Sequence, residues 1–187
     1  MNETKGPSLS ERLPGDPGRD EQIARMLRVD HAGEYGAVRI YEGQLAVLGR
    51  TRAGEVIRRM AAQEKKHLER FDRLLPAHRV RPTLLGPLWH AAGFALGAAT
   101  ALLGERAAMA CTVAVEEVID EHYAAQAEAL GGEEPALKST IEEFRQDELA
   151  HRDEGLAHGA EQAAGYEALT AGIKVASRLA IWLSTRI

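Results

Sequence analysis

The chain has 187 residues and a formal net charge of -5, with 45% hydrophobic and only 5% aromatic residues. This length suits one domain with a sizeable core, and the acidic balance excludes nucleic acid as the main partner. The single cysteine, Cys111, excludes an intramolecular disulfide and favours a reducing compartment. Because its neighbours in the chain are mostly apolar, we expect a buried and unreactive thiol.

The first 20 residues differ in composition from the rest of the chain. They contain several prolines and glycines among charges of both signs, and they have no apolar run. We therefore predict a flexible N-terminal tail over residues 1–20, followed by one helical domain over residues 21–187. The tail resembles neither a secretory signal nor a mitochondrial transit peptide, which is poor in acids, so a bacterial cytoplasmic protein, or one that has already been processed, fits better.

From residue 21 onward the apolar residues recur with helical periodicity, and no stretch alternates convincingly with the period of a strand. Glycines and prolines divide this region into six predicted helices with short turns between them, which indicates an all-α bundle. The predicted helices cover residues 21–49, 54–75, 84–103, 105–130, 135–159 and 166–187.

The first two predicted helices carry ionisable residues inside their apolar stripes. In the first helix the stripe is interrupted by Glu34, and in the second it is completed by Glu64 and His67. Residues three apart lie on one face of a helix, so Glu64 and His67 can present an oxygen and a nitrogen to one metal ion.

The third predicted helix, residues 84–103, contains no Asp, Glu, Lys or Arg and is just long enough to cross a bilayer. Its glycines and alanines keep its hydropathy modest, and the pair Gly93 and Gly97 would permit close approach of another helix. We expect this helix to lie in or on a membrane. Burial between subunits and a true membrane span are the alternatives.

The fourth and fifth predicted helices repeat the pattern of the first two. Glu116 lies inside the apolar stripe of the fourth helix, and Glu148 and His151 complete the stripe of the fifth. The intervals from Glu34 to Glu64 and from Glu116 to Glu148 are 30 and 32 residues, so the chain consists of two similar helix pairs.

The sixth predicted helix, residues 166–187, has a broad apolar face that includes Leu179 and Trp182 and is flanked by basic residues. This pattern is typical of a helix that lies in a membrane interface. Arg79 and Arg81 precede the other apolar helix and could meet anionic lipid headgroups.

Four helices are therefore expected to direct carboxylates into the core, where unpaired carboxylates are strongly unfavourable. Two divalent metal ions would remove their mutual repulsion. One Glu from each of two helices and Glu-x-x-His from each of two others is the ligand pattern of ferritin-like di-metal proteins, and such ligands suit iron or manganese. The alternative, four solvated acidic faces, leaves the interrupted stripes unexplained. The predicted metal ligands are Glu34, Glu64, His67, Glu116, Glu148 and His151.

The remaining histidines do not share this spacing. His158 lies seven residues after His151, and we expect a hydrogen-bonded core residue there rather than a ligand. His122 and Tyr123 follow Glu116 by nearly two turns. Two interpretations stay open: Tyr123 is a buried tyrosine with an ordinary hydrogen-bond partner, or the two residues have a role beside the metals. Surface, interface or supporting positions are expected for His31, His78 and His90.

Four strings of this sequence resemble the demethoxyubiquinone hydroxylases of ubiquinone biosynthesis. They are residues 28–37 (RVDHAGEYGA), 79–83 (RVRPT), 93–97 (GFALG) and 110–117 (ACTVAVEE), and the resemblance extends over residues 27–187. It implies a ferritin-like four-helix bundle with two additional apolar or amphipathic helices, and two iron ions on the six predicted ligands. It also implies that His122 and Tyr123 serve electron and proton transfer with the quinol.

The same resemblance implies a monooxygenase that uses O2 to hydroxylate the ring of a 2-polyprenyl-6-methoxy-3-methyl-benzoquinol, with NADH or a reductase as electron source. Because such a quinol resides in the bilayer, we expect a peripheral protein on the cytoplasmic face of the bacterial inner membrane, with the two apolar helices as the substrate entrance. A homo-oligomer and a lipid-binding accessory protein are further expectations from the family.

Two other functions are consistent with parts of the pattern. A ferritin-like ferroxidase would predict a soluble cage with polar outer surfaces, which residues 84–103 do not favour. A membrane-docking or lipid-binding partner would hold metals for structure alone, and its site would be indifferent to O2. The length of the isoprenoid tail, the electron donor and the oligomeric state stay open.

Overall fold

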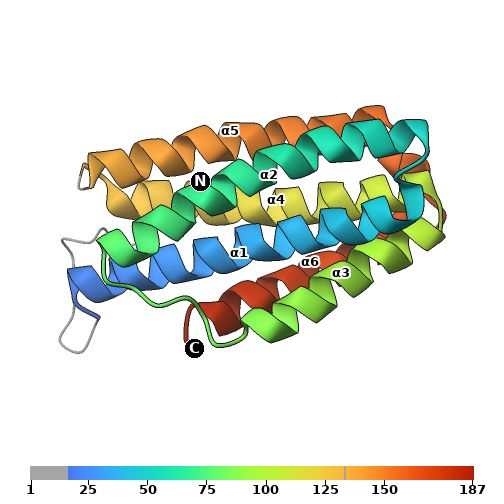
Figure 1. Ribbon diagram of the computed structural model, residues 1–187. Helices are drawn as coiled ribbons and strands as arrows, with labels where there is room; N and C mark the ends of the chain where they lie inside the picture. The colour runs from blue at the N-terminus through green and yellow to red at the C-terminus, as the bar shows by residue number, and fades with distance from the viewer. Residues whose placement is uncertain (1–16, 133) are drawn as a thin grey trace.

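The computed structural model describes residues 17–132 and 134–187, and the regular structure in these two stretches is helical (Figure 1). The all-α prediction is therefore confirmed. Most of the predicted tail over residues 1–20 lies outside the described residues, and the first helix begins at Arg19. The elements are α1 (Arg19–Leu48), α2 (Arg52–Ala77), α3 (Gly86–Leu102), α4 (Glu105–Leu130), α5 (Pro135–Ala157), the short 3-10 helix η1 (Ala160–Gln162) and α6 (Tyr166–Ser184).

The helices form three layers of two. Figure 1 shows α2 beside α5 on one side, α1 and α4 in the middle, and α3 beside α6 on the opposite side. The middle helices bridge the layers, because α1 packs against α2 and α3 while α4 packs against α5 and α6. Helices α1, α2, α4 and α5 make a ferritin-like four-helix bundle, and α3 and α6 are the two additional helices.

Local sequence explains the ends of α2 and α5. The side chain of Thr51 accepts a hydrogen bond from the backbone N–H of Gly54 and so caps the start of α2. At its other end α2 continues past the predicted stop at residue 75, through Pro76, because a proline in the last turn removes only one helical hydrogen bond. Helix α5 ends two residues earlier than predicted, where Gly159 adopts a left-handed conformation with φ of 80°.

Two apolar clusters fill the bundle and leave a polar layer between them. The first cluster contains Ile57, Met60 and Met109, and the second contains Leu27 and Phe71. On each of the four bundle helices, the predicted metal ligands fall between the residues of one cluster and those of the other. The polar layer is thus enclosed along the bundle axis by packed apolar side chains.

Helix α3 packs against α1 through glycines on both helices. A side chain at Gly93 would meet the carbonyl oxygen of Gly36 at 2.9 Å, and side chains at Gly97 and Gly43 would collide with the backbones of α1 and α3 respectively. The close approach predicted for Gly93 and Gly97 is therefore made with α1 of the same chain. Over the stretches 17–132 and 134–187, no helix has the length and apolarity needed to cross a membrane.

Candidate metal centre

All six predicted ligands lie together at the centre of the bundle, and all are buried. Glu34 comes from α1, Glu64 and His67 from α2, and Glu116 from α4, while α5 contributes Glu148 and His151. Their ligand atoms form two overlapping groups within which every pair of atoms lies within 4.8 Å, so each group could hold a metal ion. The first group is Glu34, Glu64, His67 and Glu148, and the second is Glu64, Glu116, Glu148 and His151.

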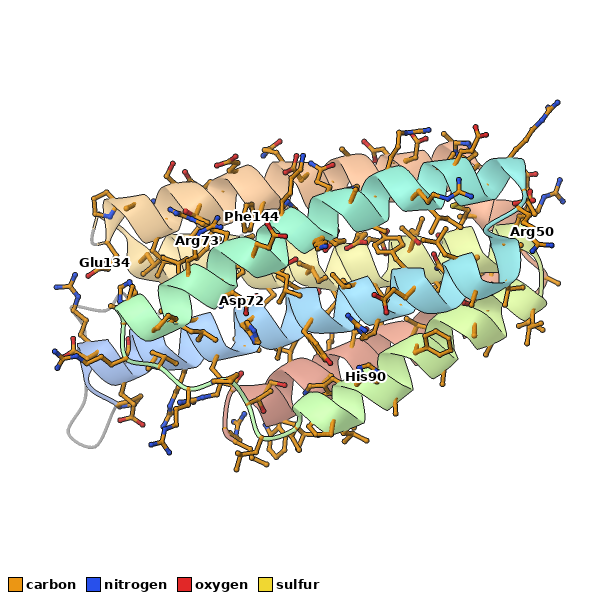
Figure 2. All side chains as sticks on the ribbon, viewed as in Figure 1. Arg50, Asp72, Arg73, His90, Glu134 and Phe144 are labelled. Atoms are coloured by element: carbon orange, nitrogen blue, oxygen red, sulfur yellow. The ribbon has the colours of Figure 1, made fainter. Side chains whose placement is uncertain are left out.

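The two histidines face the shared carboxylates from opposite sides. The Nδ1 atom of His67 lies 3.1 Å from Glu148 Oε1 and 3.5 Å from Glu34 Oε2. The Nδ1 atom of His151 lies 2.9 Å from Glu64 Oε1 and 3.5 Å from Glu148 Oε2. The ring of His67 also stacks on Phe144 with the centroids 3.9 Å apart, between α2 and α5 where Figure 2 labels Phe144.

A group of buried atoms without hydrogen-bond partners lies at the same place. Both carboxylate oxygens of Glu64 and of Glu148 lack a partner, as do the Nδ1 atoms of His67 and His151. One oxygen each of Glu34 and Glu116 is also unpaired. Unpaired buried polar groups are costly, and this donor set of carboxylates and imidazoles fits two divalent cations, which would satisfy all of them together.

Two buried tyrosines hold the second oxygen of each outer glutamate. Tyr123 on α4 donates its hydroxyl to Glu34 Oε1 on α1. Reciprocally, Tyr41 on α1 donates to Glu116 Oε1 on α4 at 2.7 Å. Each tyrosine lies seven residues after the glutamate of its own helix, and the two helices run antiparallel, so the pairs are related by an approximate twofold symmetry.

Glu64, Glu116 and Glu148 are destabilised in their charged form. Burial raises the pKa of Glu64 well above its usual range, and the neighbouring Glu148, Glu34 and Glu116 raise it further. Burial and the charge of Glu148 also raise the pKa of Glu116 well above its usual range. Burial raises the pKa of Glu148 to about 6, with His67 opposing the shift. A cation would reverse this preference by favouring the deprotonated ligands.

The two histidines respond differently to the same surroundings. Burial lowers the pKa of His67, but its approach to the carboxylates of Glu148 and Glu34 outweighs burial and raises the pKa to about 11. Burial is the largest influence on His151, and its pKa is lowered.

The structure also brings in residues that the sequence analysis did not single out. Asp30 is buried one turn before Glu34, and its Oδ1 lies 3.2 Å from His122 Nε2 and accepts a hydrogen bond of 2.7 Å from Gln126. Burial raises the pKa of Asp30, while its contacts with His122 oppose the shift. The four-residue spacing from Asp30 to Glu34 was the available signal, since it places both on one helix face.

The remaining histidines lie outside this cluster. The ring of His31 contacts Asp72 at 3.0 Å, and His90 contacts the Tyr35 hydroxyl at 2.9 Å from α3, where Figure 2 labels it. His78 is exposed at the end of α2, as expected. The expectation that His158 lies in the core is wrong. It follows the last residue of α5, where the bundle ends, and its exposed ring bonds the carbonyl oxygen of Glu154.

Cys111 is fully buried, and burial raises the pKa of its thiol to about 12. The reactive form of cysteine is the thiolate, so this thiol is unreactive at neutral pH, as the sequence predicted.

Fold and site together define a class of protein: a ferritin-like helical bundle whose buried carboxylates and histidines form two adjoining groups that could each hold a metal ion. Within that class the comparison with protein families is specific. Residues 21–184 match the family described as "Ubiquinone biosynthesis protein COQ7", and the chain belongs to this family.

Relatives from bacteria and eukaryotes match over most of the chain. A protein of Rhodospirillum rubrum named 3-demethoxyubiquinol 3-hydroxylase is 61% identical over 181 residues, which cover 96% of this chain and 85% of the relative. The Homo sapiens protein named NADPH-dependent 3-demethoxyubiquinone 3-hydroxylase, mitochondrial, is 55% identical over 88% of this chain and 78% of its own. A Saccharomyces cerevisiae protein named 5-demethoxyubiquinone hydroxylase, mitochondrial, is 43% identical with the same two coverages.

Proposed function

We propose that this protein is a di-iron monooxygenase that hydroxylates the ring of a polyprenyl demethoxyubiquinol with O2. The observation that carries the proposal is the convergence of unpaired carboxylate and imidazole atoms on one buried point, in a chain 61% identical to a protein named for this hydroxylation. Glu34 and His67 would hold one iron and Glu116 and His151 the other. Glu64 and Glu148 are shared by both groups and would bridge the two ions.

When bound, the two iron ions activate O2 for insertion into an electron-rich ring. One oxygen atom enters a ring C–H bond, and the other leaves as water with two protons and two electrons. A reduced nicotinamide, directly or through a reductase, is the electron source we propose, and several relatives carry NADPH in their names.

The chain's own residues prepare this chemistry. The hydroxyls of Tyr41 and Tyr123 each fix one oxygen of an outer glutamate, so that the other oxygen stays directed at the metal. Burial of all six ligands excludes water from the centre. We assign proton transfer to Tyr123 and His122, because Tyr123 contacts Glu34 and the neighbouring His122 is held by Asp30 and Gln126.

An apolar pocket between the two outer helices and the bundle fits the quinol. It has a cavity volume of about 170 Å³, is partly open to solvent, and is lined from α1, α3, α4 and α6. Its walls include Gly33 and Val115, the neighbours in sequence of Glu34 and Glu116, and on the other side Leu96 and Ile181. A pocket with this apolar lining suits an apolar ligand and leads from α3 and α6 toward the helices that carry the centre.

The outer helices also present an apolar surface that suits a membrane. Leu88 on α3 and Leu179 and Trp182 on α6 are each more than half exposed. Basic residues lie beside this surface. Arg178 on α6 pairs with Glu121, and the guanidinium of Arg186, two residues after the end of α6, lies 4.2 Å from the ring centroid of Trp182. We propose a peripheral position on the cytoplasmic face of a bacterial inner membrane, with the quinol entering between α3 and α6.

The proposed function is tested by loading the protein with Fe(II) without oxygen and adding 18O2 in the presence of a reduced demethoxyubiquinone analogue. About two irons per chain and a product heavier by one 18O atom are expected. Oxidation of the iron without product would replace the proposal by a ferroxidase. Failure to bind any metal would overturn it.

Filling the pocket should weaken quinol binding without disturbing the metal centre. Gly33 lines the pocket, and a side chain added there would enter open space. We expect Gly33→Leu to raise KM for the quinol about tenfold, since about 1.4 kcal/mol of lost binding has that effect. Steady-state kinetics and metal content are measured together, and an unchanged KM with normal metal content would place the quinol elsewhere.

Charges on the apolar surface should release the protein from membranes. We expect the double variant Leu179→Glu, Trp182→Glu to lower the partition onto liposomes of bacterial lipid at least tenfold, because two large apolar side chains lose their burial in lipid. The matched control is Ala62→Glu, Ala150→Glu, which adds the same charges at exposed positions of α2 and α5. Equal flotation of all three proteins would contradict a membrane role for α6.

A further inference from the structure

The two histidines of the centre have different partners on their outer nitrogens. The Nε2 atom of His67 lies 3.0 Å from Oδ2 of Asp147, a carboxylate. The Nε2 atom of His151 lies 3.3 Å from Oε1 of Gln63, an amide. Each partner immediately precedes the glutamate of the opposite Glu-x-x-His pair, so the two contacts are equivalent in position and unequal in charge.

The rest of the centre is closely matched on its two sides. Glu34 and Glu116 are both buried, and each accepts a hydrogen bond from a buried tyrosine of the other's helix. Both metal groups contain the same two shared glutamates. Among the polar groups that contact the outer nitrogens of the two histidines, the exchange of a carboxylate for an amide is therefore the chemical difference between the two positions. The buried Asp30, one turn before Glu34, adds a second carboxylate near the same position as Asp147.

A carboxylate and an amide act differently on a metal-binding imidazole. Either can accept the proton on Nε2 and so leave Nδ1 free as the donor atom. Only the carboxylate carries a negative charge, which makes the imidazole a stronger base and adds to the attraction for a cation. Asp147 is one-third exposed and His67 is almost fully buried, so the hydrogen bond is partly shielded from water.

We propose that the two metal positions are unequal, and that Asp147 makes the position of Glu34 and His67 the tighter one, which fills first. Gln63 leaves the position of Glu116 and His151 weaker and more readily exchanged. Asp147 and Gln63 are positioning residues in this arrangement, since each acts through a histidine. The inference rests on the ligand set of the proposed function.

Anaerobic titration of the metal-free protein with Co(II), followed by visible absorption and calorimetry, tests the inequality without using enzymatic activity. We expect two binding steps in the unaltered protein. Asp147→Asn keeps an acceptor oxygen beside His67 and removes only the charge, so the tight step should weaken by about 10- to 100-fold and approach the second. Gln63→Glu, which is nearly isosteric, should tighten the second step.

Two matched variants control for charge alone. Asp153→Asn removes a carboxylate whose side chain is 63% exposed on the same helix as Asp147, and Gln146→Glu adds one at a neighbouring exposed position. Neither control variant should change the affinity of either Co(II)-binding step.

Two equal binding steps in the unaltered protein would overturn the inference, as would a tight step whose affinity is unchanged by Asp147→Asn. If Asp147→Asn does not fold, an unchanged second step in Gln63→Glu overturns it. A failure of the proposed function can be told apart from a failure of this inference. In that case the protein binds Co(II) in two unequal steps but forms no hydroxylated quinol in the 18O2 experiment.

Discussion

Replacement of Glu64 by glutamine is expected to abolish hydroxylation and at the same time to stabilise the metal-free protein. Glu64 belongs to both metal-binding groups, and neither of its oxygens has a hydrogen-bond partner among the described residues. An amide is a much weaker ligand than a carboxylate, so metal content should fall to about one ion per chain or less, and the rate of quinol hydroxylation by at least about 100-fold. Metal analysis and 18O incorporation measure both effects.

The gain in stability follows from the repulsion that the metal-free centre contains. The amide of a glutamine at position 64 can donate to the surrounding carboxylates, so we expect the free energy of unfolding of the metal-free protein to rise by about 1–3 kcal/mol at neutral pH. The pKa of Glu64 is raised in the folded state, so its contribution to stability is complete below its ordinary pKa of 4.5 and is lost as the pH rises. The difference between Glu64→Gln and the unaltered protein should thus be small near pH 4 and grow toward pH 7.

The exposed Glu69 on the same helix provides the control for this experiment. Glu69→Gln also removes one carboxylate from α2, and it should change neither metal content nor the pH dependence of stability. Full metal content and activity in Glu64→Gln would contradict a bridging role for Glu64. A loss of stability at neutral pH would contradict the account of the metal-free centre.

The residues that gather at the centre could be predicted because helical periodicity is a local property. The spacing of Glu64 and His67, or of Glu148 and His151, places each pair on one helix face whatever the helix packs against. A carboxylate inside an apolar stripe is directed into the core, where it requires a cation, a proton or a hydrogen-bond donor. The same reasoning failed at His158, because periodicity gives the face of a residue and does not say where along the helix the bundle ends.

Contacts between helices could not be predicted from the sequence, because they depend on the relative direction and register of the packed helices. Tyr41 and Tyr123 each lie seven residues after a predicted ligand, but their hydrogen bonds to Glu116 and Glu34 require α1 and α4 to be antiparallel and aligned. The contact of Asp147 could not be predicted for the same reason. The sequence singled out its neighbour Glu148, but only the packing of α5 against α2 brings Asp147 to His67. Longer-range pairing of this kind is set by tertiary packing.

Gly97→Ala is expected to destabilise the protein although it adds a favourable residue to a helix. An alanine in place of glycine normally stabilises an exposed helical position by up to about 1 kcal/mol. At Gly97 the added methyl group would collide with the carbonyl oxygen of Ile40, which belongs to the backbone of α1 and cannot turn aside. Helix α3 has to move away from α1, and we expect the free energy of unfolding to fall by about 2–3 kcal/mol.

Gly172→Ala on α6 makes the same substitution with open space around the new methyl group, and it should be neutral or slightly stabilising. Urea unfolding of the metal-loaded proteins compares the two variants directly. Because α3 is also a wall of the apolar pocket, its displacement in Gly97→Ala should raise KM for the quinol while the number of bound metal ions stays the same. Equal stability of the two variants would mean that α3 is not held against α1 in solution. The contact between the bundle and its outer helices would then be looser than the glycines of α1 and α3 indicate.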